Sequence, residues 1–214
     1  MSYIKLEQVG KEVKKRPLLH DVNADIAQNS ITVFEGINGS GKTLVLKAIL
    51  GLIRTTGQIF VNDQQIKVED PYPVKAGILI ENPSLIENFT AYQNMDLLAK
   101  LDKNIQDEEI IELLSYFDLD KFPKQKVKKF SLGMKQKLGI AEALLGKYPL
   151  IVLDEPTNAL DEKSVTKLID IIKKYNLTGS TFIIASHDRD FIEQVATKQL
   201  IIKEGTIINE KQEN

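Results

Sequence analysis

The stretch Gly36-Ile37-Asn38-Gly39-Ser40-Gly41-Lys42-Thr43 has the spacing G-x-x-x-x-G-K-[ST] at every fixed position. Its glycines let the backbone curl, so that successive N–H groups point inward and can bind the oxygens of a phosphate. The apolar run Ile31-Thr32-Val33-Phe34 precedes the loop, and Leu44, Ala48 and Leu52 follow it at helical spacing. The helix would add the positive end of its dipole to the same anion site. These residues predict a strand, a phosphate-binding loop and a helix in succession.

Within this loop two side chains have the chemistry to act on a nucleotide. Lys42 would reach the β- and γ-phosphates of ATP, and the Thr43 hydroxyl would ligate Mg²⁺. The other nucleotide contacts are expected from the loop itself, from Gly36, Asn38, Gly39, Ser40 and Gly41. The alternative, a plain glycine-rich turn, is weakened by the apolar strand before the loop and the helix after it.

A second apolar strand, at 150–153, ends in the two carboxylates Asp154 and Glu155, followed by Pro156. A parallel strand that is buried on both faces delivers such residues to the ligand crevice at its carboxyl end. There, Asp154 would hold Mg²⁺ through water, and Glu155 would be the general base that polarises the attacking water. A solvated acidic turn is the alternative, and the phosphate-binding loop in the same chain favours the functional interpretation.

Composition limits the class of protein. Hydrophobic residues make up 43% of the 214 residues and charged residues 27%, which suits a globular domain with a buried core. The net charge of −2 argues weakly against a dedicated nucleic-acid binder. The absence of cysteine excludes disulfides and thiolate metal sites. With no apolar run of about 18 residues, a membrane process would need a separate membrane-spanning partner.

The order of elements predicts an α/β fold with a mostly parallel sheet. A mainly β section comes first, and apolar strands then alternate with helices. We expect strands at 22–26, 31–35, 150–153, 181–185 and 200–208, and helices at 90–101, 107–117, 162–175 and 188–195. The helical stretch interrupts the alternation. The prediction is therefore one domain, 1–214, with an antiparallel β section at the N-terminus and an inserted α-helical lobe at about 84–147.

Four further segments, in order, resemble the motifs of ABC-type ATPases, which are P-loop NTPases. The segment 130–138 resembles the signature LSGGQ: Ser131 and Gly133 match, whereas Leu132 and Met134 depart from it. The other three are 77–83 at the place of the Q-loop, 157–161 resembling the D-loop with Asp161, and 185–188 resembling the switch segment with His187. The resemblance covers nearly the whole chain.

The resemblance implies an ATP-hydrolysing motor subunit of a transporter. In this family two subunits form a head-to-tail sandwich, so Ser131, Gly133 and Asp161 would contact the nucleotide held by the other subunit. Ser131 would cap a helix whose positive end faces the γ-phosphate, and His187 would hydrogen-bond that phosphate. The implied partners are a transmembrane permease and a second ATP-binding subunit, identical or not. The implied location is the cytoplasmic face of the membrane, with no nucleic acid expected as a partner.

Two positions depart from the usual family pattern. Glu81 stands where most members have Gln; its carboxylate can still reach Mg²⁺ or the water, which makes it a candidate metal and catalytic residue. This resembles the E-loop of lantibiotic-immunity and bacitracin-type exporters, although neutral drift from Gln is the alternative. Val13 occupies the place of the aromatic residue that stacks on adenine, so we expect looser base selectivity and acceptance of GTP. The transported substrate and the direction of transport stay open, with export of a peptide or amphipathic antimicrobial favoured.

Two other classes of function remain. A soluble ABC-type ATPase could act on a ribosome or nucleic-acid assembly through the basic segment 121–129. This segment contains one aromatic residue, Phe122, that could stack on a base, so a solvated loop is favoured. Ribosomal members usually carry two such domains and chromatin members a long coiled coil, neither of which fits into 214 residues. A P-loop kinase would share the phosphate loop but would not need Ser131, Asp161 or His187.

Overall fold

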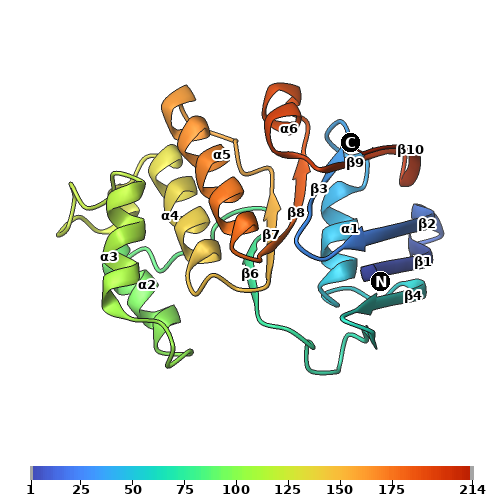
Figure 1. Ribbon diagram of the computed structural model, residues 1–214, viewed down its shortest axis with the longest axis horizontal. Helices are drawn as coiled ribbons and strands as arrows, with labels where there is room; N and C mark the ends of the chain where they lie inside the picture. Colours follow the sequence, from blue (N-terminus) through green and yellow to red (C-terminus); the bar gives the residue numbers. More distant parts are fainter. Residues whose placement is uncertain (1, 213–214) are drawn as a thin grey trace.

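The computed structural model describes residues 2–212, which fold around two β-sheets with helix α1 (Lys42–Ile49) between them (Figure 1). The larger sheet has the strand order β10-β9-β3-β8-β7-β6. Its strands are β3 (Ile31–Glu35), β6 (Ala76–Leu79), β7 (Leu150–Asp154), β8 (Thr181–Ser186), β9 (Lys198–Lys203) and β10 (Thr206–Gln212). Neighbours pair in parallel except β10, which pairs antiparallel with β9. The mostly parallel sheet is confirmed.

The smaller sheet is antiparallel and comes from the N-terminal part, as predicted. Its order is β2-β1-β4-β5, with β1 (Ser2–Val13), β2 (Arg16–Ala27), β4 (Thr56–Val61) and β5 (Gln64–Gln65). The basic run in this section contains a hairpin turn, where Lys14 and Lys15 have φ of 49° and 65°. Two successive left-handed residues match the twist of the flanking strands. Val13 is therefore the last residue before a hairpin turn.

Strands β7 and β8 in the middle of the larger sheet are buried on both faces, which explains their continuous apolar runs. In β7, Ile151 and Leu153 join the cluster under the C-terminal helices, whereas Leu150 and Val152 join the cluster around α1. Successive side chains of a strand point to opposite faces, so a strand covered on both sides has no polar positions to alternate with.

The face opposite α1 is covered by α5 (Glu162–Leu177) and α6 (Arg189–Val195), together with the helix at Leu132–Leu144. The expectation that Leu52 continues the first helix was wrong. That helix ends at Ile49, Gly51 has φ of 66°, and Leu52 is exposed. A left-handed glycine directly after a helix is a common way for the backbone to leave it.

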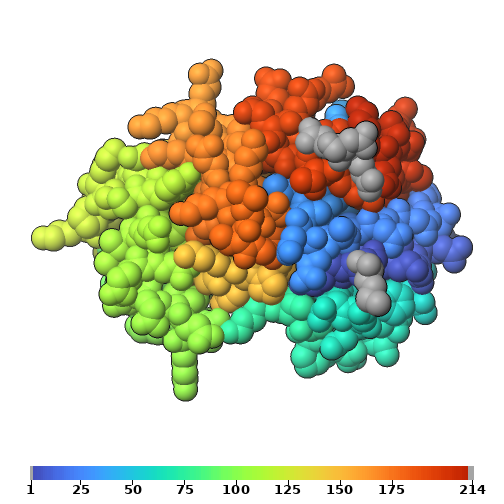
Figure 2. All heavy atoms as spheres, in the orientation of Figure 1, coloured from blue at the N-terminus to red at the C-terminus, as the bar shows by residue number. Residues whose placement is uncertain are grey.

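The elements described between β6 and β7 are helical. They are α2 (Ala91–Ala99), α3 (Asp107–Tyr116), the short 3₁₀ turn η1 (Val127–Lys129) and α4 (Leu132–Leu144). Thr90 caps α2, in a capping box with Gln93. Figure 2 shows the green part of this segment, which contains α2 and α3, at one end of the molecule. Its limits at 84 and 147 remain a prediction. Within residues 2–212, no helix has the length and apolar character needed to span a bilayer.

Strand β6 contacts helix α4 at Gly77, where a side chain would not fit. A Cβ atom there would lie 1.7 Å from the carbonyl oxygen of Ala143. We expect Gly77→Ala to destabilise the fold by about 1–3 kcal/mol or more, because backbone would have to move. Thermal unfolding should show a midpoint lower by roughly 2–12 °C. Ile78→Val, at the exposed next position, is the control; equal midpoints for the two variants would contradict this packing.

Candidate nucleotide-hydrolysis site

Four neighbouring parallel strands end at the same edge of the larger sheet, and each is followed by a segment predicted to be functional. The phosphate loop follows β3, His187 follows β8, Glu155 follows β7 and Glu81 comes shortly after β6. The strands lie in the order β3-β8-β7-β6. This arrangement brings together segments that are far apart in the chain, at the edge where α/β sheets bind ligands.

The phosphate loop curls around the side chain of Lys42, which is 5% exposed. Its Nζ donates to the carbonyl oxygens of Gly36 at 2.6 Å and Ile37 at 3.1 Å. The ammonium group therefore lies inside the ring of backbone, where a phosphate bound by the loop's N–H groups would meet it. Asn38 and Gly39 lie on the exposed side of the loop, and Ser40 is buried.

Glycine is required at two ends of this loop for different reasons. A Cβ on Gly36 would lie 2.4 Å from the carbonyl oxygen of Ile202, so the close approach of two backbone segments excludes any side chain. Gly41, the N-cap of α1, has φ of 109°, a conformation that residues with a Cβ rarely adopt. Both glycines therefore set the shape of the loop.

Asp154 and Thr43 form the candidate metal site. Thr43 Oγ1 donates to Asp154 Oδ2 at 2.9 Å, and the backbone N–H of Glu81 donates to the same oxygen at 3.3 Å. Burial raises the pKa of Asp154. Asp154 Oδ1 and Ser40 Oγ are buried without a hydrogen-bond partner among the residues described.

These side chains fit Mg²⁺. An unpaired buried carboxylate oxygen costs free energy that a cation or its bound water would recover. Mg²⁺ in nucleotide sites takes one or two protein oxygens, while phosphates and water supply the rest. A cluster of three or more His, Cys, Asp or Glu ligands is accordingly not needed, and none occurs in the described part of the chain.

Glu155 connects the phosphate loop to the switch segment. Its Oε1 lies 3.0 Å from Lys42 Nζ, and its Oε2 lies 2.8 Å from His187 Nδ1. The residue has φ of 47°, a left-handed conformation that costs about 1–3 kcal/mol for a side chain of this kind. The strained backbone turns the carboxylate back toward the phosphate loop. The side chain is only 16% exposed, which limits screening of both contacts by solvent.

Glu81 also has a left-handed backbone, with φ of 59°, but its side chain turns to a partner that the sequence did not indicate. Its Oε1 lies 2.6 Å from Nζ of Lys47, on helix α1. Lys47 is one helical turn beyond Thr43, so the pair joins the loop after β6 to the helix that follows the phosphate loop. The negative charge that Glu81 brings in place of the usual Gln is therefore balanced by a cation.

The signature and D-loop residues lie at helix starts. Ser131 is the N-cap of α4, as predicted, and its hydroxyl accepts from the backbone of Met134 at 3.2 Å. Asp161 caps α5 and bonds Ser164, which lowers the pKa of Asp161. A Cβ on Gly133 would lie 2.6 Å from the carbonyl oxygen of Ala159, so the signature helix closely contacts the D-loop.

Gln136 is a further site-shaping residue that the sequence analysis missed. Its Nε2 donates to the backbone carbonyls of Glu155 and Pro156, both at 3.3 Å. These bonds attach the signature helix α4 to the turn that carries Glu155. Gln136 lies within the segment 130–138 that resembles the signature, but only the fold shows where its side chain bonds.

Comparison with known proteins identifies the relatives of this chain. The family model described as ABC transporter matches residues 19–158. The lantibiotic transport ATP-binding protein SrtF of Streptococcus pyogenes is 36% identical over 98% of this chain and 90% of its own length. The bacitracin transport ATP-binding protein BcrA of Bacillus licheniformis is 37% identical over 98% of this chain and 69% of its own length. The dimeric ATP-binding cassette MJ0796, in a post-hydrolysis state with ADP and Pi, superimposes with a TM-score of 0.88 at 26% identity and 98% coverage of both chains.

Proposed function

This chain belongs to the ABC transporter family as an ATP-binding, ATP-hydrolysing subunit, and from that premise we propose that it drives an exporter through a separate membrane subunit. The observation that carries the catalytic assignment is the position of Glu155, between Lys42 and His187. A carboxylate held beside the phosphate-binding lysine can accept a proton from water that attacks the γ-phosphate.

Lys42 and Glu155 have complementary roles in this proposal. Each satisfies the charge of the other at 3.0 Å. The triphosphate of ATP competes for Lys42, because three phosphate groups carry more negative charge than one carboxylate. Once Lys42 bonds the β- and γ-phosphates, Oε1 of Glu155 is released toward the attacking water, while His187 holds Oε2 and bonds the γ-phosphate. Binding of substrate thereby activates the base.

Thr43 and Asp154 would hold Mg²⁺. A bound Mg²⁺ would neutralise the negative charge that develops on the phosphates. Asp154 contributes its unpaired Oδ1, directly or through water. The backbone N–H of Glu81 donates to Asp154 in this site. The carboxylate of Glu81 would reach the metal site after leaving Lys47. The remaining phosphate contacts are assigned to Gly36, Asn38, Gly39, Ser40 and Gly41.

A second subunit completes the site. The N-terminus of α4 offers free donors and the positive end of a helix dipole near Ser131 and Gly133. We assign Ser131, Gly133 and Asp161 to the nucleotide held by the facing subunit of a sandwich dimer. The dimeric state of MJ0796 supports this assembly.

The membrane partner would bind the helical lobe and the loop around Glu81, which places this subunit on the cytoplasmic face of the membrane. Relatives named for lantibiotic and bacitracin transport support export of a peptide antimicrobial. No observation favours a nucleic-acid assembly over this reading: in the basic segment 121–129, Lys121 already pairs with Asp118 at 2.7 Å and Val127 is buried.

The transporter assignment is tested by capture from membranes. A tagged Glu155→Gln protein is added with ATP to solubilised membranes of its native cell, and the stoichiometry of what co-purifies is measured. One polytopic membrane protein in equimolar or fixed ratio is expected. Recovery of ribosomes, DNA or the protein alone would leave an ATPase without this role.

Val13 gives a prediction about base recognition. It is 45% exposed at the hairpin turn, where an aromatic ring could stack on adenine. We expect the wild type to use GTP about as well as ATP, and Val13→Tyr to tighten ATP binding roughly 5- to 150-fold by stacking. Val13→Leu, which adds apolar area without a π face, is the control. Wild-type refusal of GTP, or equal gains from Leu and Tyr, would show that base stacking is not what this position controls.

A further inference from the structure

The backbone of Glu155 is strained, and hydrogen bonds from three parts of the fold hold it. Its φ of 47° is a left-handed conformation, which a residue with a side chain keeps only where its surroundings fix it. Its N–H donates to the carbonyl oxygen of Ala185 at 2.8 Å, which continues the pairing of β7 with β8. Its carbonyl oxygen accepts from the N–H of Asn158 at 3.2 Å and from Nε2 of Gln136 at 3.3 Å. Of these three partners, Gln136 is the one that bonds through its side chain.

The amide of Gln136 bonds two successive carbonyl groups of the turn after β7. Its side chain is buried, with 7% of the residue exposed, and Nε2 also donates to the carbonyl oxygen of Pro156 at 3.3 Å. An amide nitrogen has two N–H bonds to donate, so both are used here. Because the two acceptors belong to successive peptide groups, the amide fixes the direction in which the chain leaves Glu155.

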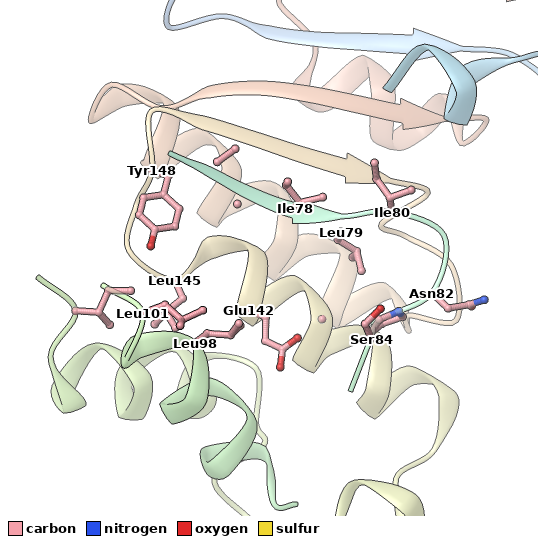
Figure 3. Close-up of a pocket in the computed structure, with 15 residues that line it drawn as sticks. Ile78, Leu79, Ile80, Asn82, Ser84, Leu98, Leu101, Glu142, Leu145 and Tyr148 are labelled. Carbon is pink, nitrogen blue, oxygen red and sulfur yellow. The ribbon is translucent and has the colours of Figure 1, made fainter. Parts of the chain in front are cut away.

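Helix α4, which carries Gln136, is itself held along its length. Gly133 lies on the same face, three residues earlier, and a Cβ atom there would lie 2.6 Å from the carbonyl oxygen of Ala159. The later turns of α4 approach β6 closely at Gly77. Figure 3 shows this part of α4 beside β6, with Glu142 pointing into a groove of about 510 Å³. Gln136 therefore bonds the turn from a helix with little freedom to shift.

We propose that Gln136 is a positioning residue for ATP hydrolysis, because its two hydrogen bonds keep Glu155 in the strained conformation that directs the carboxylate to the attacking water. The inference rests on the role of base proposed above for Glu155, and it identifies the side chain that holds that base in place. Without these bonds the backbone of Glu155 can relax from its left-handed conformation. Its two carboxylate oxygens would then move away from Lys42 and His187, which they now contact at 3.0 Å and 2.8 Å.

One helix would thus act on two nucleotide sites. In the sandwich dimer proposed above, Ser131 and Gly133 at the start of α4 meet the nucleotide of the facing subunit. Gln136 follows Ser131 by five residues, a rise of about 7.5 Å along a helix, and acts on the base of its own chain. The role of Gln136 is therefore distinct from that of the residues at the start of α4.

Replacement of Gln136 by methionine tests its role, because methionine is unbranched and of similar length but has no N–H to donate. We expect Gln136→Met to lower the ATPase rate at saturating ATP roughly 5- to 150-fold. ATP should bind at least as tightly as to the wild type, because Lys42 and the phosphate loop are unchanged. The ATP-induced rise in unfolding midpoint measures that binding and shows that the variant is folded. If Gln136→Met does not fold, Gln136→Asn takes its place, since its amide is one methylene too short to reach both carbonyls.

The Glu155→Gln background separates positioning of the base from support of the fold. In a protein that lacks the base, loss of Gln136 should leave the residual ATPase rate unchanged, because residues that act through one group are not additive. An equal fall in both backgrounds, or normal turnover by Gln136→Met, overturns the inference. Normal turnover by Glu155→Gln itself would instead refute the proposed function on which the inference rests.

Asn94→Leu is the matched control for loss of a buried amide. Asn94 is 4% exposed, and its Nδ2 donates to the carbonyl oxygens of Ile86 at 3.3 Å and Thr90 at 3.0 Å, in the helical lobe. This variant should lose stability but keep its turnover. If it lost as much turnover as Gln136→Met, loss of a buried amide rather than displacement of Glu155 would be the cause, and the inference would be wrong.

Mixed dimers test on which site Gln136 acts. Two differently tagged copies, one of them Glu155→Gln, are mixed with ATP, purified through both tags and started with Mg²⁺, so that one copy alone has a base. Gln136→Met should reduce phosphate release when it is placed in the copy that keeps Glu155, and much less when it is placed in the other. Ser131→Ala should show the reverse dependence. The reverse result for Gln136→Met overturns the inference, whereas failure to form mixed dimers counts against the sandwich and leaves the decision to the Glu155→Gln background.

Discussion

Glu155→Gln is expected to lower the ATPase rate roughly 10²- to 10⁴-fold while ATP binding is kept. The amide cannot accept a proton from water, but it has nearly the same shape and can still bond Lys42 and His187. Removal of the negative charge also eliminates the competition between the carboxylate and the phosphates for Lys42, 3.0 Å away. ATP should therefore bind at least as tightly, and the dimer should persist. Phosphate release, equilibrium binding of labelled ATP and size-exclusion chromatography with ATP and Mg²⁺ measure the three effects.

The matched control for this variant is Glu35→Gln. Glu35 ends the neighbouring strand β3, its side chain is 19% exposed against 16% for Glu155, and its nearest cation is Arg189 at 3.7 Å. It should retain turnover within a small factor. Normal hydrolysis by Glu155→Gln would show that another group is the base. Loss of ATP binding together with turnover would instead assign Glu155 a structural role in holding the loop.

Lys42→Ala is expected to weaken ATP binding roughly 10- to 150-fold, the range for loss of a charge-assisted hydrogen bond. It also removes the ammonium group that bonds Gly36 and Ile37, so the loop loses its central contact. Without Lys42, the carboxylate of Glu155 also has no lysine to neutralise it beside the phosphates. The loss of the lysine contacts and the uncompensated negative charge both weaken ATP binding. The measurement is the ATP-induced rise in unfolding midpoint, which depends on the ratio of ATP concentration to Kd.

Lys198→Ala controls for removal of a buried lysine. Lys198 is 8% exposed, and its Nζ donates to the carbonyl oxygen of Asp25 at 2.7 Å, on the side of β2 remote from the phosphate loop. This variant should lose stability but keep the full ATP-induced shift. If Lys42→Ala kept the shift as well, the phosphate-binding role of Lys42 would be wrong.

Most elements could be predicted from local pattern. The strand at Ile31–Glu35 has the bounds expected, and the helices starting after Thr90, Ser131 and Asp161 have capping side chains that are visible in the sequence. Side-chain period and capping chemistry are local properties, which is why one sequence suffices for them. Strands β4 and β6 were not identified as strands, because they are short and lie in segments rich in turn residues.

The sequence was sufficient to name the candidate catalytic residues, but not the side chains and carbonyl groups with which they pair. The spacing of the phosphate loop indicates Lys42 by itself, since glycines and a lysine at fixed offsets have one chemical use. The pairing of Lys47 with Glu81 and of Gln136 with the carbonyl of Glu155 joins segments separated by 34 and 19 positions in the chain. No local pattern contains such a relation.

The sequence by itself determined the phosphate-binding loop, the strand that carries Asp154 and Glu155, and the family, because each depends on residue identity at short spacing. Tertiary structure alone decided that Lys42, Glu155 and His187 form one connected set. This set follows from the parallel order β3-β8-β7-β6, which places the ends of distant strands side by side, and from the left-handed backbone of Glu155, which turns its carboxylate inward.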